Sequence, residues 1–172
     1  MKKIKYMSLM MALATVLSLC FTACSSDDEK DMTPPVISGQ GIAVASPINC
    51  EVYHPGDVIP VRYMLTDDMA LGSFNIEVHD NFDHHTHSTE GDNHEGTECE
   101  DHDGEHHHDG KEEGTTWKYN ESFKIDGGVT AYPINVDITV PKDARHGDYH
   151  FMIKVTDLAG WQQLKALAIK IE

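Results

Sequence analysis

The chain has 172 residues, and its 29 acidic residues against 13 lysines and arginines give a formal net charge of −16 with neutral histidine. A surface this acidic repels nucleic acid, because binding requires lysine and arginine to replace the counterions of the phosphates. It attracts cations instead. The composition therefore excludes a nucleic-acid partner, and the length suits one domain with a true hydrophobic core.

The first residues have the pattern of a secretory signal peptide. Lysines precede an apolar run over residues 7–21, which is too short to span a bilayer as a helix. The run ends at Ala23-Cys24, and a small residue directly before a cysteine resembles a lipobox. We predict a lipoprotein signal peptide over residues 1–23 and a lipid anchor on Cys24; the alternative is ordinary secretion with an unmodified cysteine.

Residues 24–33 contain serine and several aspartates and form a predicted acidic tether. This stretch resembles the tether of surface-exported lipoproteins in the Bacteroidetes, which implies a lipid-anchored outer-membrane protein exposed at the cell surface. The plainer interpretation is a solvated linker of low hydrophobicity.

Apolar residues in the rest of the chain alternate with period two, and no segment sustains a helical period of 3.6. The predicted strands cover residues 34–45, 58–65, 70–80, 116–125, 132–140, 146–157 and 160–172. The last of these could also be read as a helix, but it is short and follows a turn. Short strands separated by turn signals predict an all-β fold, an immunoglobulin-like or fibronectin-like sandwich of about seven strands over residues 34–172.

One local motif supports this fold class. Tyr149 and Phe151 resemble the tyrosine corner of immunoglobulin-like domains, in which a tyrosine lies two residues before a core position of the sixth strand. Phe151 replaces the usual core cysteine, which favours the disulfide-free bacterial immunoglobulin-like or fibronectin-like group. The plainer interpretation is that Tyr149 is an ordinary core aromatic.

Residues 80–114 interrupt the predicted sandwich between its third and fourth strands. They consist largely of glycine, histidine, aspartate and glutamate, with Phe82 as the only large apolar residue. Such a segment cannot bury enough surface to offset its ordering entropy. We predict a long, disordered, histidine- and acid-rich insertion.

Imidazole and carboxylate groups are ligands that suit Zn²⁺, Cu²⁺ and Ni²⁺. Imidazole is mostly neutral at pH 7, because its unperturbed pKa is about 6.5, and it can then bind metal. The candidate ligands of the insertion are His84, His85, His87, His94, Cys99, His102, His106, His107 and His108. The plainer interpretation is a solvated, pH-responsive spacer. Cys99 could instead form a disulfide with Cys50, since the cell exterior is oxidising.

Two further histidines come from the predicted scaffold. In immunoglobulin-like topology the third and sixth strands are neighbours, and the apolar alternation directs both His79 and His150 outward. We expect the two to lie near one another on an exposed sheet face, where ligands cost less ordering entropy than on a loop alone. His146 is a possible extra ligand, and His54 is expected in a turn. The alternative is that His79 and His150 are ordinary surface histidines.

Other signals are weaker. Thr66-Asp67-Asp68 and Asp157-x-x-Gly160 resemble the calcium-binding loops of cadherin-like domains, but a full ligand set is missing, so we interpret them as Asx-type turns. No nucleophile elbow, phosphate loop or pair of catalytic carboxylates is present, and a mobile loop cannot hold catalytic geometry. We therefore expect no enzyme.

Four segments, PPVIS, HPGDVIPV, IEVHDNFDHHTHS and GDYHFMIKVTDLAGW, resemble a family of uncharacterised Bacteroidetes lipoproteins with an immunoglobulin-like domain of unknown function. The resemblance covers nearly all of the mature domain, apart from residues 90–114, and implies a fold and a location rather than a mechanism. The residues favour capture or buffering of Zn²⁺, with Cu²⁺ or Ni²⁺ as alternatives and an outer-membrane importer as recipient. The alternative is an adhesion module in which the sandwich binds a partner.

Overall fold

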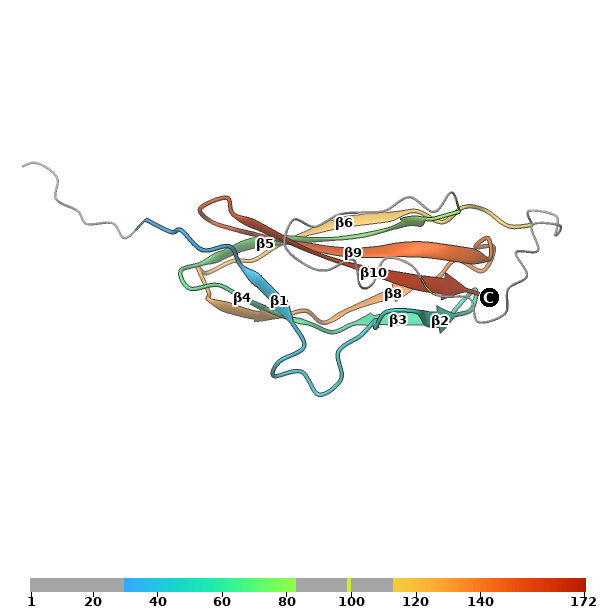
Figure 1. Cartoon of the computed structure of the whole chain (residues 1–172), viewed down its shortest axis with the longest axis horizontal. Coiled ribbons are helices and arrows are strands. Elements are labelled where there is room, and N and C mark those ends of the chain that lie inside the picture. The colour runs from blue at the N-terminus through green and yellow to red at the C-terminus, as the bar shows by residue number, and fades with distance from the viewer. Residues whose placement is uncertain (1–29, 83–98, 100–112) are drawn as a thin grey trace, which may run out of the picture. The chain divides into compact units, whose positions relative to one another are not determined.

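Ten β-strands and no helix make up the described part of the chain, which in this computed structural model is residues 30–82, 99 and 113–172 (Figure 1). The all-β prediction is confirmed. The strands are β1 Val36–Ser38, β2 Glu51–Tyr53, β3 Val58–Val61, β4 Met64–Thr66, β5 Leu71–Asp80, β6 Tyr119–Lys124, β7 Ala131–Pro133, β8 Val136–Thr139, β9 Gly147–Asp157 and β10 Gln162–Ile171. No helix within these residues has the length and apolar character that a membrane span requires.

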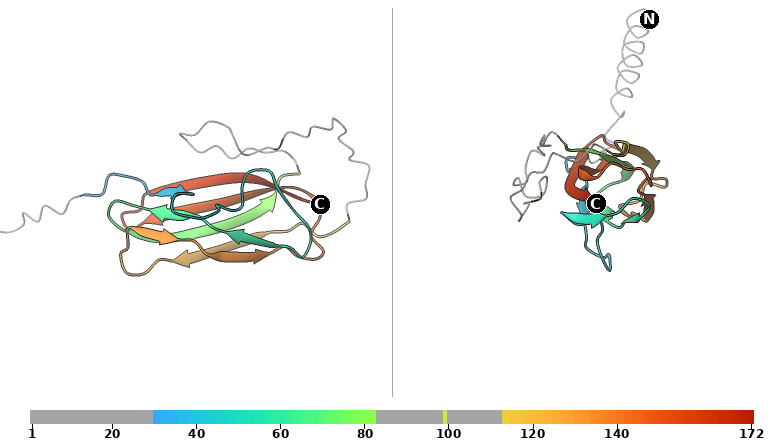
Figure 2. Two further views of the ribbon diagram at one scale, coloured as in Figure 1. Left: turned by 90° about the horizontal axis from the view of Figure 1, so that it is seen from below. Right: turned by 90° about the vertical axis from the view of Figure 1, so that its right-hand side faces the viewer.

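The strands form two facing layers. Five strands make the larger sheet, in the order β2-β10-β9-β5-β6, in which β5, β9 and β10 pair antiparallel and β2 pairs parallel with the end of β10. The opposite layer consists of the three-stranded sheet β1-β4-β7 and the pair β3-β8. Figure 2 shows these strands from below and from one end, arranged around a common interior. The predicted neighbours, the third and sixth strands, are β5 and β9.

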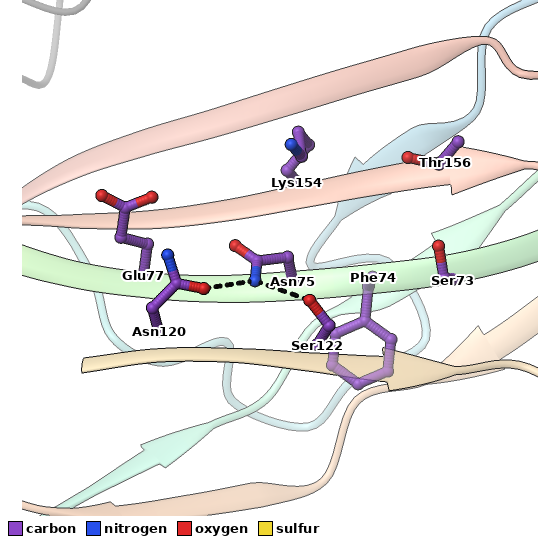
Figure 3. A pocket seen from close by; sticks show the side chains of 8 residues that line it. All are labelled: Ser73, Phe74, Asn75, Glu77, Asn120, Ser122, Lys154 and Thr156. Atoms are coloured by element: carbon purple, nitrogen blue, oxygen red, sulfur yellow. Dashed lines mark hydrogen bonds between the residues drawn. The ribbon is translucent and has the colours of Figure 1, made fainter.

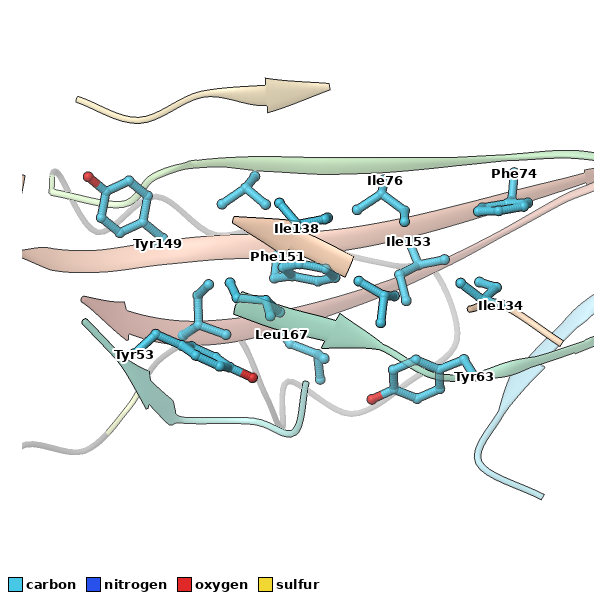
Figure 4. Packing of buried hydrophobic residues seen from close by; sticks show 14 of the residues in the cluster. Tyr53, Tyr63, Phe74, Ile76, Ile134, Ile138, Tyr149, Phe151, Ile153 and Leu167 are labelled. Atoms are coloured by element: carbon cyan, nitrogen blue, oxygen red, sulfur yellow. The ribbon is translucent and has the colours of Figure 1, made fainter. Parts of the chain in front are cut away.

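The interior is filled by the inward-facing positions of both layers. Alternate residues of β5 from Phe74 to Val78 are buried, and in β9 the residues from Tyr149 to Ile153 are all buried. Phe74 stacks on Phe123 of β6 with ring centroids 4.7 Å apart. Figure 4 shows Tyr53, Tyr63, Phe74, Ile76, Ile134, Ile138, Tyr149, Phe151, Ile153 and Leu167 packed in this core. Each large apolar side chain buried in this way stabilises the fold by about 1.5–3 kcal/mol before entropy is counted.

Two predicted strands, 58–65 and 132–140, are each divided in the structure. The break falls at Arg62, whose backbone pairs with Ser46 in an isolated bridge and so leaves the β3-β8 ladder. Across the break the Arg62 guanidinium donates a hydrogen bond to the carbonyl oxygen of Val136 at 2.8 Å. The break thus coincides with a backbone bridge to a residue outside the predicted strand, which alternation does not reveal.

The N-terminal strands also differ from the prediction. Within the predicted strand 34–45, only the three residues of β1 form a strand, after which the chain turns at Gly39 and Gly41. Strand β2 was not predicted at all, because three residues are too few for an alternation to be detected. Its pairing with β10 depends on a partner that is distant in the sequence.

The tyrosine corner is present. Tyr149 is fully buried, and its hydroxyl donates a hydrogen bond to the carbonyl oxygen of Arg145 at 2.8 Å, four residues upstream. Burial raises the pKa of the Tyr149 hydroxyl, so it remains a protonated donor at neutral pH. This geometry is typical of immunoglobulin-like domains and fixes the chain as it enters β9.

Replacing Tyr149 by phenylalanine should lower the free energy of unfolding by about 1 kcal/mol, because the part-buried carbonyl oxygen of Arg145 loses this donor while the ring packing is retained. Urea denaturation measures the change. Tyr132→Phe, at a partly buried tyrosine of β7, is the matched control and should have a smaller effect. A urea midpoint that stays the same in Tyr149→Phe would show that the corner does not stabilise the fold.

The corner also holds both ends of the predicted insertion. Asp80 is still paired with Tyr149 in the β5-β9 ladder. The rings of Phe82 and Tyr149 meet edge-on with centroids 5.3 Å apart, and the Arg145 guanidinium carbon lies 4.2 Å from the centroid of the Phe82 ring. The sandwich thus includes residues 80–82, which the predicted boundary placed in the insertion. On the C-terminal side of the insertion, the Arg145 amide donates a hydrogen bond to the carbonyl oxygen of Thr115 at 3.0 Å. Residues 83–98 and 100–112 lie outside the described part of the chain.

Gly147 is required by this arrangement. Its φ is +135°, and a Cβ placed there would lie 2.7 Å from the Phe82 ring. Only glycine adopts this backbone conformation without strain and also leaves room for the ring. Gly147, the first residue of β9, therefore leaves the space in which the Phe82 ring packs.

Candidate metal centre

His79 of β5 and His150 of β9 lie side by side. They are direct partners in the antiparallel register, and their ring centroids are 5.4 Å apart with an interplanar angle of 59°. Both side chains point to the outer face of the larger sheet, because Val78 and Phe151, on the inward positions beside them, are in the core. The predicted proximity of the two histidines is confirmed.

The expected exposure of this pair is wrong. His150 is 0% exposed, and the His79 side chain is 17% exposed. Strand β9 is the central strand of its sheet, so His150 is flanked by His79 on β5 and by Ala168 on β10. Met152, the next outward residue of β9, is also buried. Both imidazoles are thus held in a largely dry, rigid setting.

Glu77 completes the arrangement on β5. It lies two residues before His79 on the same face, and its Oε1 is 3.1 Å from Nδ1 of His79. A carboxylate at one ring nitrogen favours the tautomer in which the other nitrogen carries the lone pair. Glu77 lies beside Nδ1 of His79, at ion-pair distance. Glu77 was not predicted as a site residue, although its i,i+2 spacing from His79 in a predicted strand is a usable signal.

A shallow polar hollow of about 300 Å³ continues from Glu77 along the outer face of the sheet (Figure 3). Asn75 lies at its centre and donates hydrogen bonds to Oδ1 of Asn120 at 2.9 Å and Oγ of Ser122 at 3.0 Å. Its lining is Ser73, Phe74, Asn75, Glu77, Asn120, Ser122, Lys154 and Thr156. This surface has the polarity of a solvated sheet face.

Cys99 is bonded to Cys50 in a disulfide with Cα atoms 5.5 Å apart. The prediction that Cys99 could be a metal ligand is therefore wrong for the oxidised protein, because only a thiolate binds metal. The amide of Cys50 donates to the carbonyl oxygen of Ala168 at 2.8 Å, and Ala168 is the β10 partner of His150. The disulfide thus joins residue 99 to the β2 edge of the sheet, with β10 between that edge and the strand of His150.

A family model for a domain of unknown function, DUF4625, matches residues 22–172. The chain belongs to the DUF4625 family. No curated protein matches it. Among solved structures, Spo0M, the sporulation control protein from Bacillus subtilis, is similar with a TM-score of 0.40 at 9% identity. The match covers 82% of this chain and 50% of that one, so this chain spans half of that protein's length.

Most predicted ligands of this DUF4625 chain lie outside the described residues; these are His84, His85, His87, His94, His102, His106, His107 and His108. His146, predicted as a possible extra ligand, is exposed and directly precedes β9. His54 lies in the turn between β2 and β3, where its carbonyl oxygen accepts from the Asp57 amide at 2.9 Å. The predicted turn role of His54 is confirmed.

The DUF4625 domain contains a second group of potential ligands, at the other end of β5. The carboxylates of Asp31, Asp67 and Asp157 offer oxygens that all lie within 4.8 Å of one another, and they are the only such group of three among the described residues. Asp67 and Asp157 do form the predicted Asx-type turns. Asp31 was not predicted, because it lies in the tether and only the folded chain brings it there.

Proposed function

We propose that this protein is a cell-envelope lipoprotein that binds a divalent transition metal, with Zn²⁺ as the preferred ion, for capture or buffering. His79 and His150 would form the rigid part of the site, and histidines of the insertion would supply the remaining ligands. The observation that carries the proposal is the pairing of these two imidazoles on adjacent strands, 5.4 Å apart.

This separation suits a shared ion. Two imidazoles on one tetrahedral Zn²⁺ have centroids roughly 5 Å apart, because each Zn–N bond is about 2.0 Å and each ring adds about 1 Å along it. The β-ladder sets the distance between the two backbones, so little ordering entropy is lost when the metal binds. Glu77 beside Nδ1 of His79 has the position of the carboxylate partner found behind many zinc-binding histidines.

The insertion is tied close to this pair at described residues. Phe82 packs at the corner, and His84 and His85 follow it within three residues, which an extended chain spans in about 10 Å. Cys99 is bonded to the neighbouring edge of the sheet, with His102 three residues further along. Both anchors support the proposal, because few residues separate them from His84, His85 and His102 in the sequence.

The location follows from the residues before the fold. The signal peptide over residues 1–23, lipidation of Cys24 and the acidic tether would place the domain on the outer membrane, facing the cell surface. An anchored binder at that place would raise the local metal concentration, and an outer-membrane importer is the partner we propose as its recipient. We propose no enzymatic activity.

One observation favours a second function, an adhesion or interaction module. The polar hollow around Asn75 is an open part of the sheet that a protein or glycan partner could contact without any metal. A partner captured equally well in the presence of a chelator, and lost on Asn75→Arg, would support this function and would leave the metal incidental.

Zinc titration by calorimetry tests the proposed function. In the variant, every histidine between residues 83 and 112 is replaced by asparagine, which preserves the length, the acidity and the disulfide. We expect the mature protein to bind several Zn²⁺ ions and the variant to retain at most one, more weakly, because only the scaffold pair remains. Equal zinc stoichiometry for the two proteins would refute capture by the insertion.

A further inference from the structure

A second cation site is assembled where the N-terminal segment joins the sandwich. Asp31 precedes β1, Asp67 lies between β4 and β5, and Asp157 ends β9. Their nearest carboxylate oxygens are all within 4.8 Å of one another. This cluster lies beside Leu71, the β-partner of Asp157, whereas His79 is eight residues further along β5, about 26 Å away at 3.3 Å per residue.

In Asp67 and Asp157, one carboxylate oxygen already accepts hydrogen bonds from backbone amides. Oδ1 of Asp157 accepts hydrogen bonds from the amides of Gly160 at 2.6 Å and Trp161 at 2.8 Å. Oδ1 of Asp67 accepts from the amides of Met69 at 3.0 Å and Ala70 at 2.7 Å. These bonds fix both carboxylates in orientation, so the direction of each second oxygen is determined by the backbone.

The second oxygens lack partners. Oδ2 of Asp157 and Oδ2 of Asp67 are buried and accept no hydrogen bond, and Asp157 as a whole is only 4% exposed. A buried carboxylate oxygen with no donor is costly, and three carboxylates at this separation also repel one another. Among the described residues, no lysine, arginine or histidine forms an ion pair with any of the three.

We infer that Asp31, Asp67 and Asp157 bind a hard divalent cation, Ca²⁺. The available ligands are all oxygens, which hard cations prefer and which suit Zn²⁺ poorly beside a histidine-rich site. Ca–O bonds of 2.3–2.6 Å allow oxygens on opposite sides of the ion to be up to about 5 Å apart, so the observed spread fits a single ion. Water and backbone carbonyls would complete its shell.

The bound ion would fasten the tether to the domain. Trp161 already donates its indole N–H to the carbonyl oxygen of Asp31 at 3.2 Å, so the segment before β1 contacts the β9–β10 turn without metal. Calcium would add a link among three segments that are far apart in sequence. Binding would thus hold Asp31, at the start of the described domain, against the two turns, a role separate from transition-metal capture at His79 and His150.

Calorimetry with CaCl₂ on the whole mature protein, after treatment with a chelator, tests the inference. Asp157→Asn retains an oxygen for the Gly160 and Trp161 amides but removes the charge, and Asp31→Asn changes a residue on which no strand depends. We expect each variant to bind Ca²⁺ at least tenfold more weakly at the tightest site. The matched control is Asp68→Asn, an exposed neighbour in the same loop, which should bind as the parent does.

Thermal denaturation gives a second measurement. Calcium should raise the melting temperature of the parent and of Asp68→Asn but not that of Asp157→Asn, which without calcium should be at least as stable as the parent because repulsion is relieved. Unchanged calcium affinity in either Asp31→Asn or Asp157→Asn would overturn the site. That outcome would leave zinc binding untouched, since His79 and His150 are absent from this cluster.

Discussion

Loss of His79 and His150 together should weaken the tightest zinc binding by about 100-fold or more, equivalent to about 3 kcal/mol of binding free energy. The reason is that the β5-β9 ladder holds both imidazoles in place, so the insertion would have to supply two further ligands at an entropic cost. Competition titration with a zinc indicator, using His79→Ala/His150→Ala, measures the change. An unchanged tightest affinity would refute the scaffold site.

Two companion variants separate ligation from folding. His79→Ala alone removes one ligand from a side chain that is partly exposed, so the fold should tolerate it, and affinity should still fall at least tenfold. His54→Ala removes an exposed histidine from a distant turn and should leave zinc binding as it is.

For the parent, zinc binding should weaken as pH falls through about 6.5, since protons compete with the metal for imidazole.

Loss of the Cys50–Cys99 disulfide should lower the free energy of unfolding by about 4 kcal/mol, because the bond closes a loop with a sequence separation of 49 residues in the unfolded chain. Chemical denaturation of Cys50→Ser/Cys99→Ser beside the oxidised parent measures this. Zinc affinity should also fall in the variant, since the insertion is then held at its two ends only.

The single variant Cys50→Ser provides the critical comparison. It leaves Cys99 as a free thiol next to several histidines, and a thiolate there would bind metal. If Cys50→Ser binds Zn²⁺ more tightly than the double variant, and Co²⁺ substitution gives a thiolate charge-transfer band, Cys99 is a ligand in the reduced protein. If the parent retains its stability when reduced, the disulfide does not contribute to the fold as we predict.

The two proposed sites place different chemistry at the two ends of one strand. The end of β5 that carries His79 offers nitrogen ligands beside the insertion, and the end near Leu71 offers carboxylate oxygens beside the tether. Soft and hard cations would therefore be separated by ligand type as well as by distance. Calcium would act on the attachment of the domain, and zinc would be its cargo.

Much of the fold follows from local pattern. The alternation from Phe74 to His79 in β5 and from Tyr149 to Val155 in β9 predicted which residues face inward, because side chains in a strand alternate between its faces. The irregularity between Leu71 and Ser73 was not predicted. The alternation also placed His79 beside His150 once the immunoglobulin-like order of strands was assumed, and the spacing around Tyr149 identified the corner that Arg145 completes. These features depend on neighbours in sequence or on a common topology, so they could be predicted from the sequence alone.

Other features depend on which distant segments meet. Alternation says that His150 faces outward, but its complete burial is a property of the folded chain that alternation does not give. Likewise, each turn aspartate is recognisable in the sequence, whereas the convergence of Asp31, Asp67 and Asp157 exists only in the folded chain. Side-chain direction is a local property of the backbone, but solvent exposure and ligand convergence are set by long-range packing, which this sequence does not display in any single segment.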